Sequence, residues 1–406
     1  MTRFLLALVA ALLLAAPAQA APHLERVVIV LRHGTRPPTV SNADLAKFAD
    51  RPWPAWPVAP GELTPHGGEG VRLMGETVAA TYRAAGVLPP TGCASAGQVA
   101  VWADNADQRT RQTGRIFANA LQPGCGLAAH WSPAAPRDPI FTGTSEAACA
   151  QDPDKASAAI MAIVSDPLLS SPLDRPLARL QAIMAPTACA GGPGTCFAKT
   201  QPTVGPRGAA VVYPNTPALA EDLLLEYVDG MPMADVGWGR ASRADIVDVM
   251  AIHEHLFALV RDNAYAADRR GAPMARIILA ALAGAPVGGG PQSGPDTRVF
   301  VLAGHDTNLA WMAGVFGLRW RFDDMPHFTA PATTLAFELW SDHGRQYVRP
   351  VVYHLALDQL RTLEPPRAET TALQFPDCAN GPLQSCPLET LRHRLETAIP
   401  RDCGTL

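Results

Sequence analysis

Lysine is scarce in this chain of 406 residues, which has only three lysines, at positions 47, 155 and 199. The formal net charge is -4 and the sequence pI is about 6.3, so there is no excess of basic charge. Proteins that bind nucleic acids usually carry a basic patch or have a high pI. Nucleic acid is therefore excluded as an expected partner. The hydrophobic fraction of 48% is typical of a globular chain rather than a disordered one.

Long apolar runs are absent beyond the first 20 residues, MTRFLLALVAALLLAAPAQA. That segment begins with a positive Arg3, continues with an apolar stretch from Phe4 to Ala16, and ends in the small residues Ala18-Gln19-Ala20. This pattern indicates a secretory signal peptide, and its apolar part is short for a membrane span. We therefore expect cleavage after Ala20 and a soluble, exported mature protein with no membrane partner.

The sequence has no C-x-x-C pair, and this absence argues against a zinc site of the cysteine type. An even number of cysteines in an exported chain favours disulfides, although eight cysteines allow many pairings. Short separations favour Cys189–Cys196 and Cys378–Cys386, and Cys93–Cys125 and Cys149–Cys403 would then remain.

Three apolar runs are mostly continuous rather than alternating, as expected for parallel strands covered on both faces. They are VVIVL (27–31), QVAVWAD (98–104) and VFVLAG (299–304). A further strand is predicted at LAFELW (335–340), and helical patterns occupy Gly68–Ala85 and Gln108–Leu121. The pattern predicts an α/β fold with a mostly parallel central sheet and helices on both faces.

The region from 151 to 290 differs, because it shows helical periodicity without a clear strand. Its predicted helical segments are Lys155–Ser165, Leu177–Met184, Ala218–Val228, Ile246–Asn263 and Pro273–Ala283. The Gly/Pro-rich run GAPVGGGPQSGPD (284–296) is interpreted as an exit linker. We therefore predict an α/β domain formed by 21–150 together with 291–406, and a smaller, mostly helical inserted subdomain at 151–290.

Polar and reactive residues follow each of the three predicted parallel strands. They are Arg32, His33 and Arg36 after the first strand, Arg109 after the second, and His305 with Asp306 after the third. In parallel α/β sheets, ligands bind outside the carboxyl ends of the strands. If the three strands are neighbours, these side chains meet in one crevice.

The chemistry of such a crevice indicates phosphoryl transfer. Guanidinium groups match phosphate oxygens bidentately, and no group of acidic residues resembles a Mg²⁺ site, so the arginines would supply the positive charge. Neighbouring cations favour a neutral His33 that can attack phosphorus and form a phosphohistidine. Protonated Asp306 would then act as general acid, which favours acidic pH. His305 would add a hydrogen bond or a positive charge.

The residues that carry this chemistry match a signature of R-H-G-x-R-x-P near the mature N-terminus with a late H-D pair. They stand here as RHGTRPP (32–38) and HD (305–306). At these residues the chain resembles the histidine acid phosphatases, and within them the bacterial periplasmic phytases and acid phosphatases. Further supporting segments are WPAWPV (53–58), LTPHGGE (63–69), QRTRQTG (108–114), GMPMADVGWGR (230–240) and GHDTNLA (304–310).

The resemblance implies catalytic roles for His33, as nucleophile, and for Asp306, as proton donor. It also implies substrate contacts, which are assigned to Arg32, Arg36, Thr39, Arg109 and His305. The family fold is an α/β domain with a smaller α domain, and no metal or cofactor is expected. We accordingly expect a periplasmic monomer that acts on a small-molecule phosphate ester such as phytate or another sugar or inositol phosphate.

Two segments depart from the phytase pattern. Phytase-like members carry a lysine beside the pocket threonine, where this chain has Val40, and a P-P-G-G run where this chain has FTAPATT (328–334). Both departures lie where the rest of the substrate would sit, and Val40 removes a cation that a highly phosphorylated substrate favours. They weigh against a preference for phytate and leave phosphatase activity untouched.

Three other functions are compatible with parts of this sequence. One is a narrow sugar-1-phosphate phosphatase of the same fold, and another is a non-catalytic periplasmic binding protein for phosphate esters. A binding protein needs neither a nucleophile nor an acid, whereas this chain keeps His33 and Asp306. The third is a phosphoglycerate-mutase-like transferase of the cytosol, which the signal peptide and the predicted disulfides argue against.

The segment His253-Glu254-His255 suggests a metal site at first sight. Because His253 and His255 are only two positions apart on a predicted helix, they point to different faces of it. Core or surface histidines are therefore the preferred interpretation.

Overall fold

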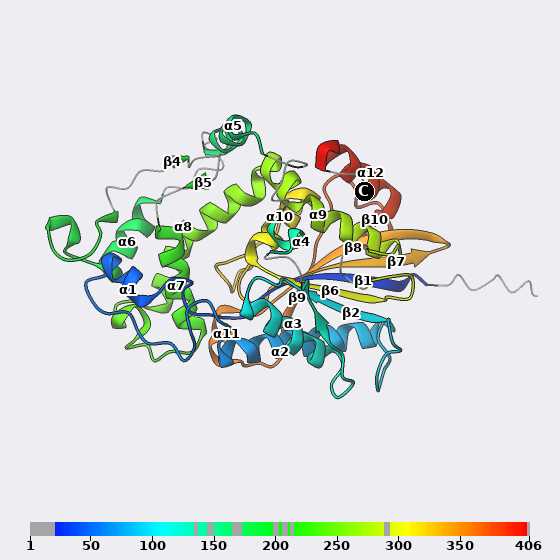
Figure 1. Ribbon diagram of the computed structural model, residues 1–406, viewed down its shortest axis with the longest axis horizontal. Coiled ribbons are helices and arrows are strands. Elements are labelled where there is room, and N and C mark those ends of the chain that lie inside the picture. The colour runs from blue at the N-terminus through cyan, green and yellow to red at the C-terminus, as the bar shows by residue number, and fades with distance from the viewer. Residues whose placement is uncertain are drawn as a thin grey trace, which may run out of the picture.

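The computed structural model describes residues 21–133, 137–143, 149, 151–164, 173–197, 203–204, 210–211, 215–287 and 293–403. The predicted signal peptide, residues 1–20, lies outside the described residues, as does 288–292 within the predicted linker. In Figure 1 the strands of the central sheet run through the centre and right of the molecule, while α6 (Asp174–Met184), α7 (Thr216–Val228) and α8 (Arg243–Asp262) lie to the left of that sheet.

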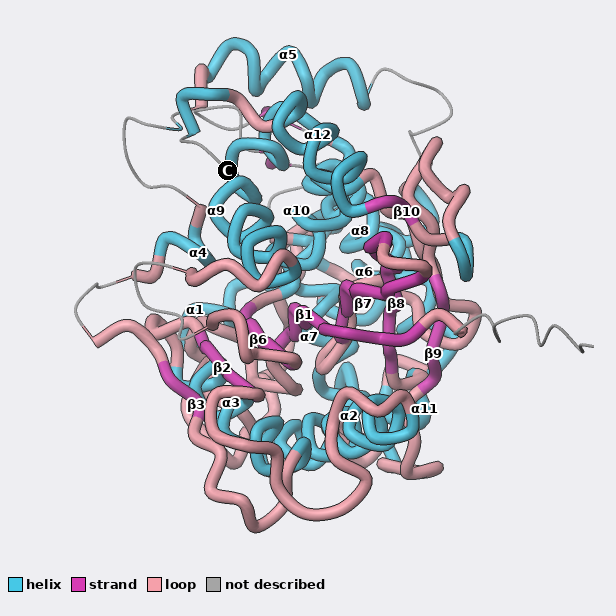
Figure 2. The backbone as a smooth tube through the Cα atoms, turned by 90° about the vertical axis from the view of Figure 1, so that its right-hand side faces the viewer, coloured by secondary structure: helices cyan, strands magenta, loops and turns pink. Residues whose placement is uncertain are grey.

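An eight-stranded mixed sheet forms the centre, in the order β10-β8-β7-β1-β6-β2-β3 with β9 paired to β8 (Figure 2). Its strands are β1 (His23–Arg32), β2 (Val99–Ala103), β3 (Ala129–His130), β6 (Val299–Gly304), β7 (Thr334–Asp342), β8 (Arg345–His354), β9 (Glu369–Ala372) and β10 (Cys386–Pro387). The three predicted parallel strands are confirmed as neighbours: β1 pairs with β6, and β6 pairs with β2, all parallel.

The other half of the sheet is antiparallel, so the expectation of a mostly parallel sheet needs correction. The strand β7, which contains the predicted segment 335–340, pairs antiparallel with both β1 and β8. A tight hairpin joins β7 to β8 through His343 and Gly344, which both have positive φ, 49° and 74°. Two-residue hairpin turns of this kind connect only antiparallel strands, which is the physical reason for the change of direction.

Helices cover both faces of the sheet, which confirms the α/β class (Figure 1). One face is covered by α2 (Pro65–Ala84) and α3 (Gln108–Leu121), the other by α9 (Ala264–Leu282), α10 (Asp306–Phe316) and α12 (Leu388–Ala398). Because β1 is central and covered on both sides, its residues 27–31 are all at most 1% exposed. A continuous apolar run is the sequence consequence of that double coverage.

The region between β3 and β6 is mostly helical. Its longer helices are α5 (Pro153–Val164), α6 (Asp174–Met184), α7 (Thr216–Val228) and α8 (Arg243–Asp262), followed by α9. The sequence missed one feature there, the two-stranded sheet of β4 (Thr203–Val204) and β5 (Ala210–Val211), because strands of two residues are too short to show an alternating pattern. The short helix α4 (Pro139–Thr142) also lies in this region, whereas α1 (Asn42–Leu45) and α11 (Leu357–Thr362) lie outside it.

The helix α9 begins nine residues before the predicted start at Pro273 and continues through that proline. Proline is favoured at the first position of a helix, so the sequence pattern placed the boundary too late. Since α9 packs against β1 and β7, it contributes to one face of the sheet. The proposed division into an α/β domain and a helical subdomain at 151–290 stays a prediction.

Four disulfides link the cysteines as predicted: Cys93–Cys125, Cys149–Cys403, Cys189–Cys196 and Cys378–Cys386. The second joins positions 254 residues apart, so it closes most of the chain into one loop. Within the described ranges, no helix has both the length and the apolar character needed to span a bilayer.

Candidate active site

The loop that follows β1 is held between the ends of two other strands. The amide of His33 donates to the carbonyl of Gly304 at the end of β6, and the amide of Asp104 after β2 donates to Ala303. On the other side, the amide of Ala332 donates to the carbonyl of His33. These bonds place the carboxyl ends of β1, β6 and β2 at one point, where the sequence-predicted residues meet.

The helix α2 supports the same loop from behind. Its N-cap residue Thr64 donates its amide to the carbonyl of Thr35 at 3.1 Å and accepts the amide of Gly67 on its hydroxyl. A Cβ at Gly67 would lie 2.3 Å from the carbonyl oxygen of Thr35. Only glycine therefore permits this close approach of helix and loop.

His33 is almost completely buried, with 2% of its surface exposed. Its Nδ1–H donates to the carbonyl of Gly34 at 2.8 Å, which leaves the lone pair on Nε2. Burial, followed by the charges of Arg109 and Arg32, holds the pKa of His33 well below its ordinary value. The ring is therefore neutral, with an unprotonated nitrogen available for attack.

Arg32 and Arg36 converge on a carboxylate that the sequence did not single out, Glu221 on α7. One Nη of Arg32 contacts Glu221 Oε1 and lies 2.9 Å from Asp306 Oδ2, while Nη2 of Arg36 lies 3.1 Å from Glu221 Oε2. The carbonyl of Thr329 accepts the other Nη of Arg32. Although burial acts to raise it, the two guanidinium groups hold the pKa of Glu221 well below its ordinary value. The pair of arginines is thus fixed in place by a permanent negative charge.

His305 and Asp306 form the start of α10. The Nε2–H of His305 donates to Asp104 Oδ2 at 2.7 Å, so Nδ1 is the nitrogen left for a ligand. The carboxylate of Asp306 accepts the amide of Thr307 on Oδ1 and contacts Arg32 with Oδ2. Its side chain is 15% exposed, in contrast to that of Arg32, which is fully buried.

Arg109 and Thr39 lie next to Gly61, in the part of the site formed by α3 and the end of the loop after β1. Arg109 is the second residue of α3, and its guanidinium donates to the carbonyl of Gly61 at 3.1 Å and to Asp107 at 3.0 Å. A Cβ built at Gly61 would contact both Arg109 Nη1, at 3.4 Å, and Thr39 Cγ2, at 3.6 Å, so these two side chains lie near each other beside that glycine. Thr39 itself is exposed, so it lies farther from the buried centre than the other predicted residues.

The sequence missed the residues that hold the predicted ones: Glu221, Asp104 and Thr329. One signal for Glu221 was present in the run EDLLLEYV (221–228), where three acidic residues interrupt an apolar helix and are buried. Charged groups that are buried in such a helix usually need a partner. The contact with Thr329 could not be found, because it uses only a backbone carbonyl.

Two groups of side chains among the described residues are spaced closely enough to hold a metal ion. One group, Asp104, Asp107 and His305, adjoins the predicted phosphate-binding residues, and there His305 is already bonded to Asp104. The other, formed by Glu221, His253 and His327, lies behind Arg32 and is fully buried.

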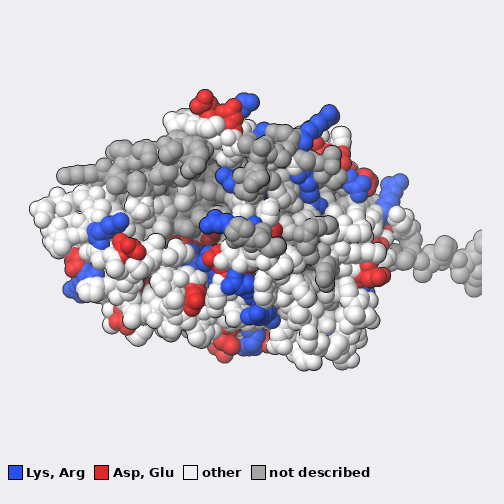
Figure 3. Space-filling view, viewed as in Figure 1, with Lys and Arg blue, Asp and Glu red and all other residues white. Residues whose placement is uncertain are grey.

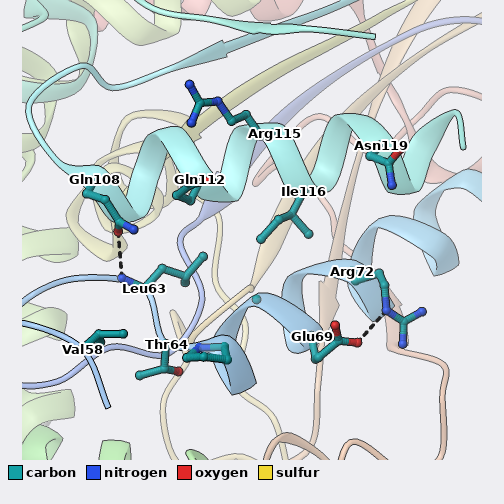
Figure 4. A pocket seen from close by; sticks show the side chains of 12 residues that line it. Val58, Leu63, Thr64, Glu69, Arg72, Gln108, Gln112, Arg115, Ile116 and Asn119 are labelled. Carbon is teal, nitrogen blue, oxygen red and sulfur yellow. Dashed lines mark hydrogen bonds and ion pairs between the residues drawn. The ribbon is translucent and has the colours of Figure 1, made fainter. Parts of the chain in front are cut away.

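A cavity of about 600 Å³ lies between α2 and α3 (Figure 4). Leu63 and Ile116 line its apolar part, Glu69 and Arg72 form an ion pair at its rim, and Gln108 accepts the amide of Leu63. None of the predicted site residues lines it, so it is separate from the crevice at the strand ends.

The face of the molecule that Figure 3 draws does not show one dominant sign of charge. On the face drawn in Figure 3, basic and acidic side chains of the described residues are interspersed. The concentration of arginines at the strand ends is therefore an internal feature, since Arg32 and Arg36 are 0% and 8% exposed.

Comparison with known proteins adds independent information. The model of the histidine phosphatase superfamily (branch 2) matches residues 23–167. The chain is 31% identical over 374 residues to Phytase AppA of Escherichia coli, covering 86% of this chain and 85% of that protein. It is 26% identical to a glucose-1-phosphatase of Salmonella typhimurium, covering 92% of each.

Solved structures agree with these relatives. The Hafnia alvei phytase in complex with tartrate matches with a TM-score of 0.85 and 30% identity, covering 96% of this chain and 100% of that one. The same phytase has also been solved with myo-inositol hexakis sulphate, with a TM-score of 0.85 and 29% identity over 96% of this chain and 100% of that one. The phytase from Citrobacter braakii matches with a TM-score of 0.83 and 27% identity over 94% and 99% of the two chains.

Proposed function

Since the chain belongs to branch 2 of the histidine phosphatase superfamily and is a histidine acid phosphatase similar to phytases, we propose that it hydrolyses sugar or inositol phosphomonoesters through a phosphohistidine at His33. One observation carries this proposal. His33 is neutral and buried, its Nδ1–H is tied to a carbonyl, and its free Nε2 lies among three guanidinium groups.

In the first step, Nε2 of His33 attacks phosphorus and the bond from phosphorus to the ester oxygen breaks. Arg32, Arg36 and Arg109 bind the phosphoryl oxygens and neutralise the charge that develops on them. His305, held through Nε2 by Asp104, presents Nδ1 to the same group and adds a hydrogen bond or a positive charge there. These contacts hold the phosphoryl group in line with His33.

The leaving oxygen needs a proton, and Asp306 is the carboxyl group placed to give it. In the second step, Asp306 as carboxylate takes a proton from water while the water oxygen attacks the phosphohistidine. Inorganic phosphate leaves, and His33 and Asp306 return to their initial protonation states. Acid is consumed in the first step and restored in the second, so no net proton is required from the protein.

A second candidate for the substrate is a sugar 1-phosphate alone. It is favoured by Val40, which is 46% exposed where phytase-like proteins carry a lysine, and by the similarity to a glucose-1-phosphatase. A lysine at this position would strengthen the binding of a substrate with many phosphates, whereas it would not help a monophosphate. Its absence therefore favours the smaller substrate.

Export to the periplasm is part of the proposal. The four disulfides support it, since such bonds persist in oxidising compartments, and so does the signal-like segment 1–20 of the sequence.

The test is an assay of the purified mature protein at mildly acidic pH in the presence of EDTA. Phytate, glucose 1-phosphate and p-nitrophenyl phosphate are compared side by side, and phosphate release is measured. We expect hydrolysis of at least the two small esters, and release from phytate would extend the substrate class to highly phosphorylated inositols. No phosphate release from any of the three substrates would instead favour a non-catalytic binding protein.

The variant His33→Ala should lose activity on every substrate while its unfolding midpoint stays close to that of the wild type. The matched control is His393→Ala, which removes an exposed histidine from α12. Quenching a reaction with labelled substrate should trap phosphate on the wild type and on the control, but not on His33→Ala. Wild-type turnover by His33→Ala would contradict the proposed mechanism.

A further inference from the structure

The buried cluster of Glu221, His253 and His327 brings together three metal-binding side chains from three parts of the chain. Glu221 lies on α7, His253 on α8, and His327 in the segment between α10 and β7. They are 5%, 3% and 0% exposed, and one ligand atom from each lies within 4.8 Å of the other two. The sequence pattern of 253–255 did not suggest this, because the second histidine comes from a distant segment and not from His255.

Each histidine has one nitrogen occupied and one that faces no strong partner. The Nδ1–H of His253 donates to the carbonyl of Pro217 at 3.0 Å, and its buried Nε2 has no hydrogen-bond partner. His327 contacts Glu254 Oε1 through Nδ1 at 2.5 Å, and its Nε2 has only the hydroxyl of Thr329 at 3.3 Å. A buried nitrogen without a partner normally costs stability, so this one calls for an explanation.

This arrangement is the one that orients histidines toward metals. Metal-binding histidines donate their other ring N–H to a carboxylate or a backbone carbonyl, and here Glu254 and Pro217 fill those two roles. The ring of His253 is further fixed by stacking on Phe257, with centroids 4.5 Å apart.

Glu221 supplies the oxygen of the cluster. Its two oxygens accept from Arg32 and Arg36, and each carboxylate oxygen has a second lone pair for a further ligand. Two imidazole nitrogens with one carboxylate oxygen form a donor set that suits Zn²⁺. Zinc–ligand bonds of about 2.0 Å would draw the three groups together by side-chain movements on the order of 1 Å.

We propose that Glu221, His253 and His327 form a Zn²⁺ site behind the phosphate pocket. The ion takes no part in the reaction, and the site does not depend on the proposed mechanism. The site shares Glu221 with the two arginines that are proposed to bind phosphate.

This sharing has a consequence for phosphate, which does rest on the proposed function. A Zn²⁺ ion on Glu221 takes up part of the negative charge that now neutralises Arg32 and Arg36. Those guanidinium groups then attract a phosphoryl dianion more strongly. Inorganic phosphate, the product, should therefore inhibit the zinc-loaded protein at lower concentration than the zinc-free protein.

The test uses the whole mature protein, freed of metal with EDTA and titrated with ZnCl₂ near neutral pH in a calorimeter. We expect one Zn²⁺ per chain, loss of that binding in His327→Asn, and a loss of roughly 10- to 100-fold in affinity in Glu254→Gln, whose residue only orients His327. The matched control is His255→Asn on the same helix, which should bind Zn²⁺ like the wild type.

Crystals soaked in ZnCl₂ locate the ion by anomalous diffraction at the zinc edge. A peak between Glu221, His253 and His327 supports the proposal. A peak only at Asp104, Asp107 and His305, no peak at all, or unchanged calorimetry in His327→Asn overturns it. Circular dichroism and the unfolding midpoint without metal show whether each variant is folded, so a lost site is distinguished from a lost fold.

Inhibition by inorganic phosphate tests the proposed effect of Zn²⁺ on phosphate binding separately from the existence of the Zn²⁺ site. The inhibition constant of phosphate should fall on zinc loading in the wild type and in His255→Asn, and stay unchanged in His327→Asn. An unchanged constant in a wild type that carries zinc at the cluster overturns the coupling. Because binding is measured without substrate, failure of the proposed hydrolysis would leave the zinc result interpretable.

Discussion

At the scale of single residues, the site depends on which atom of each side chain is left free. His33 and His305 each have one ring nitrogen bonded to a fixed acceptor, Gly34 and Asp104 respectively, so the other nitrogen has a defined role. Glu221 neutralises Arg32 and Arg36 in the absence of substrate. Without that carboxylate, two buried positive charges would face each other at a high energetic cost.

Asp306 provides a test at this scale. Asp306→Asn should lower turnover of an alkyl ester such as glucose 1-phosphate by a factor on the order of 10²–10⁴, because the leaving oxygen no longer receives a proton. p-Nitrophenyl phosphate should lose far less, since its leaving group departs without protonation. Both rates are measured by steady-state kinetics.

The control for this prediction is Asp377→Asn, which changes an exposed carboxylate away from the site. Equal losses on both esters would contradict the acid role. They would indicate that Asp306 acts only through its contact with Arg32.

At the scale of elements, strand ends and helix starts position the site. Three parallel strands end together, α10 begins at Asp306, and α2 begins behind the loop that contains Thr35. The approach of α2 is close enough that one of its residues must be glycine. The geometry of the loop after β1 is therefore a property of two elements in contact, and not of the loop alone.

Gly67→Ala tests this contact. The new Cβ would lie 2.3 Å from the oxygen and 2.5 Å from the nitrogen of Thr35, so the loop must shift. We expect a loss of about 1–3 kcal/mol in the free energy of unfolding from overpacking, together with a loss of turnover. Urea unfolding and p-nitrophenyl phosphate kinetics measure the two effects.

The neighbouring Gly68→Ala is the matched control. Its Cβ would meet only the ends of the side chains of Ile116 and Leu63, at 3.2 and 4.0 Å, and these can move. Alanine is also favoured over glycine in a helix by about 0.5–1 kcal/mol. Identical behaviour of the two variants would show that the contact between α2 and the loop does not constrain the site.

At the scale of the whole molecule, buried acids make stability depend on pH. Burial raises the pKa of Glu226, and also that of Asp222, to about 8, and Glu226 is 1% exposed. In the unfolded chain both groups titrate near their ordinary values, so the native state binds more protons between those values and about pH 8. The contribution of these two groups to stability is therefore fully present in acid and is lost as pH rises through that range.

Glu226→Gln isolates one of these groups. The backbone N–H of Gly237 donates to Glu226 Oε2 at 2.9 Å. The side-chain oxygen of glutamine can accept the same hydrogen bond, but glutamine does not ionise. Relative to the wild type, the variant should gain stability as pH rises from 5 to 7, by at most about 1.4 kcal/mol per pH unit. Urea unfolding at several pH values measures this difference, and a gap that does not change with pH would refute the prediction.

The sequence by itself determined the three central strands, the helix α3 and the reactive residues at the strand ends, and its short cysteine separations favoured two of the disulfides. These features are local: a doubly covered strand must be continuously apolar, and the residues that follow it lie at its carboxyl end. His33, Asp306 and the arginines could therefore be named from short segments and from their position after predicted strands.

Only the tertiary structure decided which groups hold the reactive residues. Glu221, Asp104 and His327 come from segments far from their partners in the chain, and Thr329 contributes a carbonyl that any residue would supply. The antiparallel half of the sheet likewise depends on long-range pairing as well as on its local hairpin. Such contacts arise from the packing of separate elements, and no local pattern of residue types encodes them.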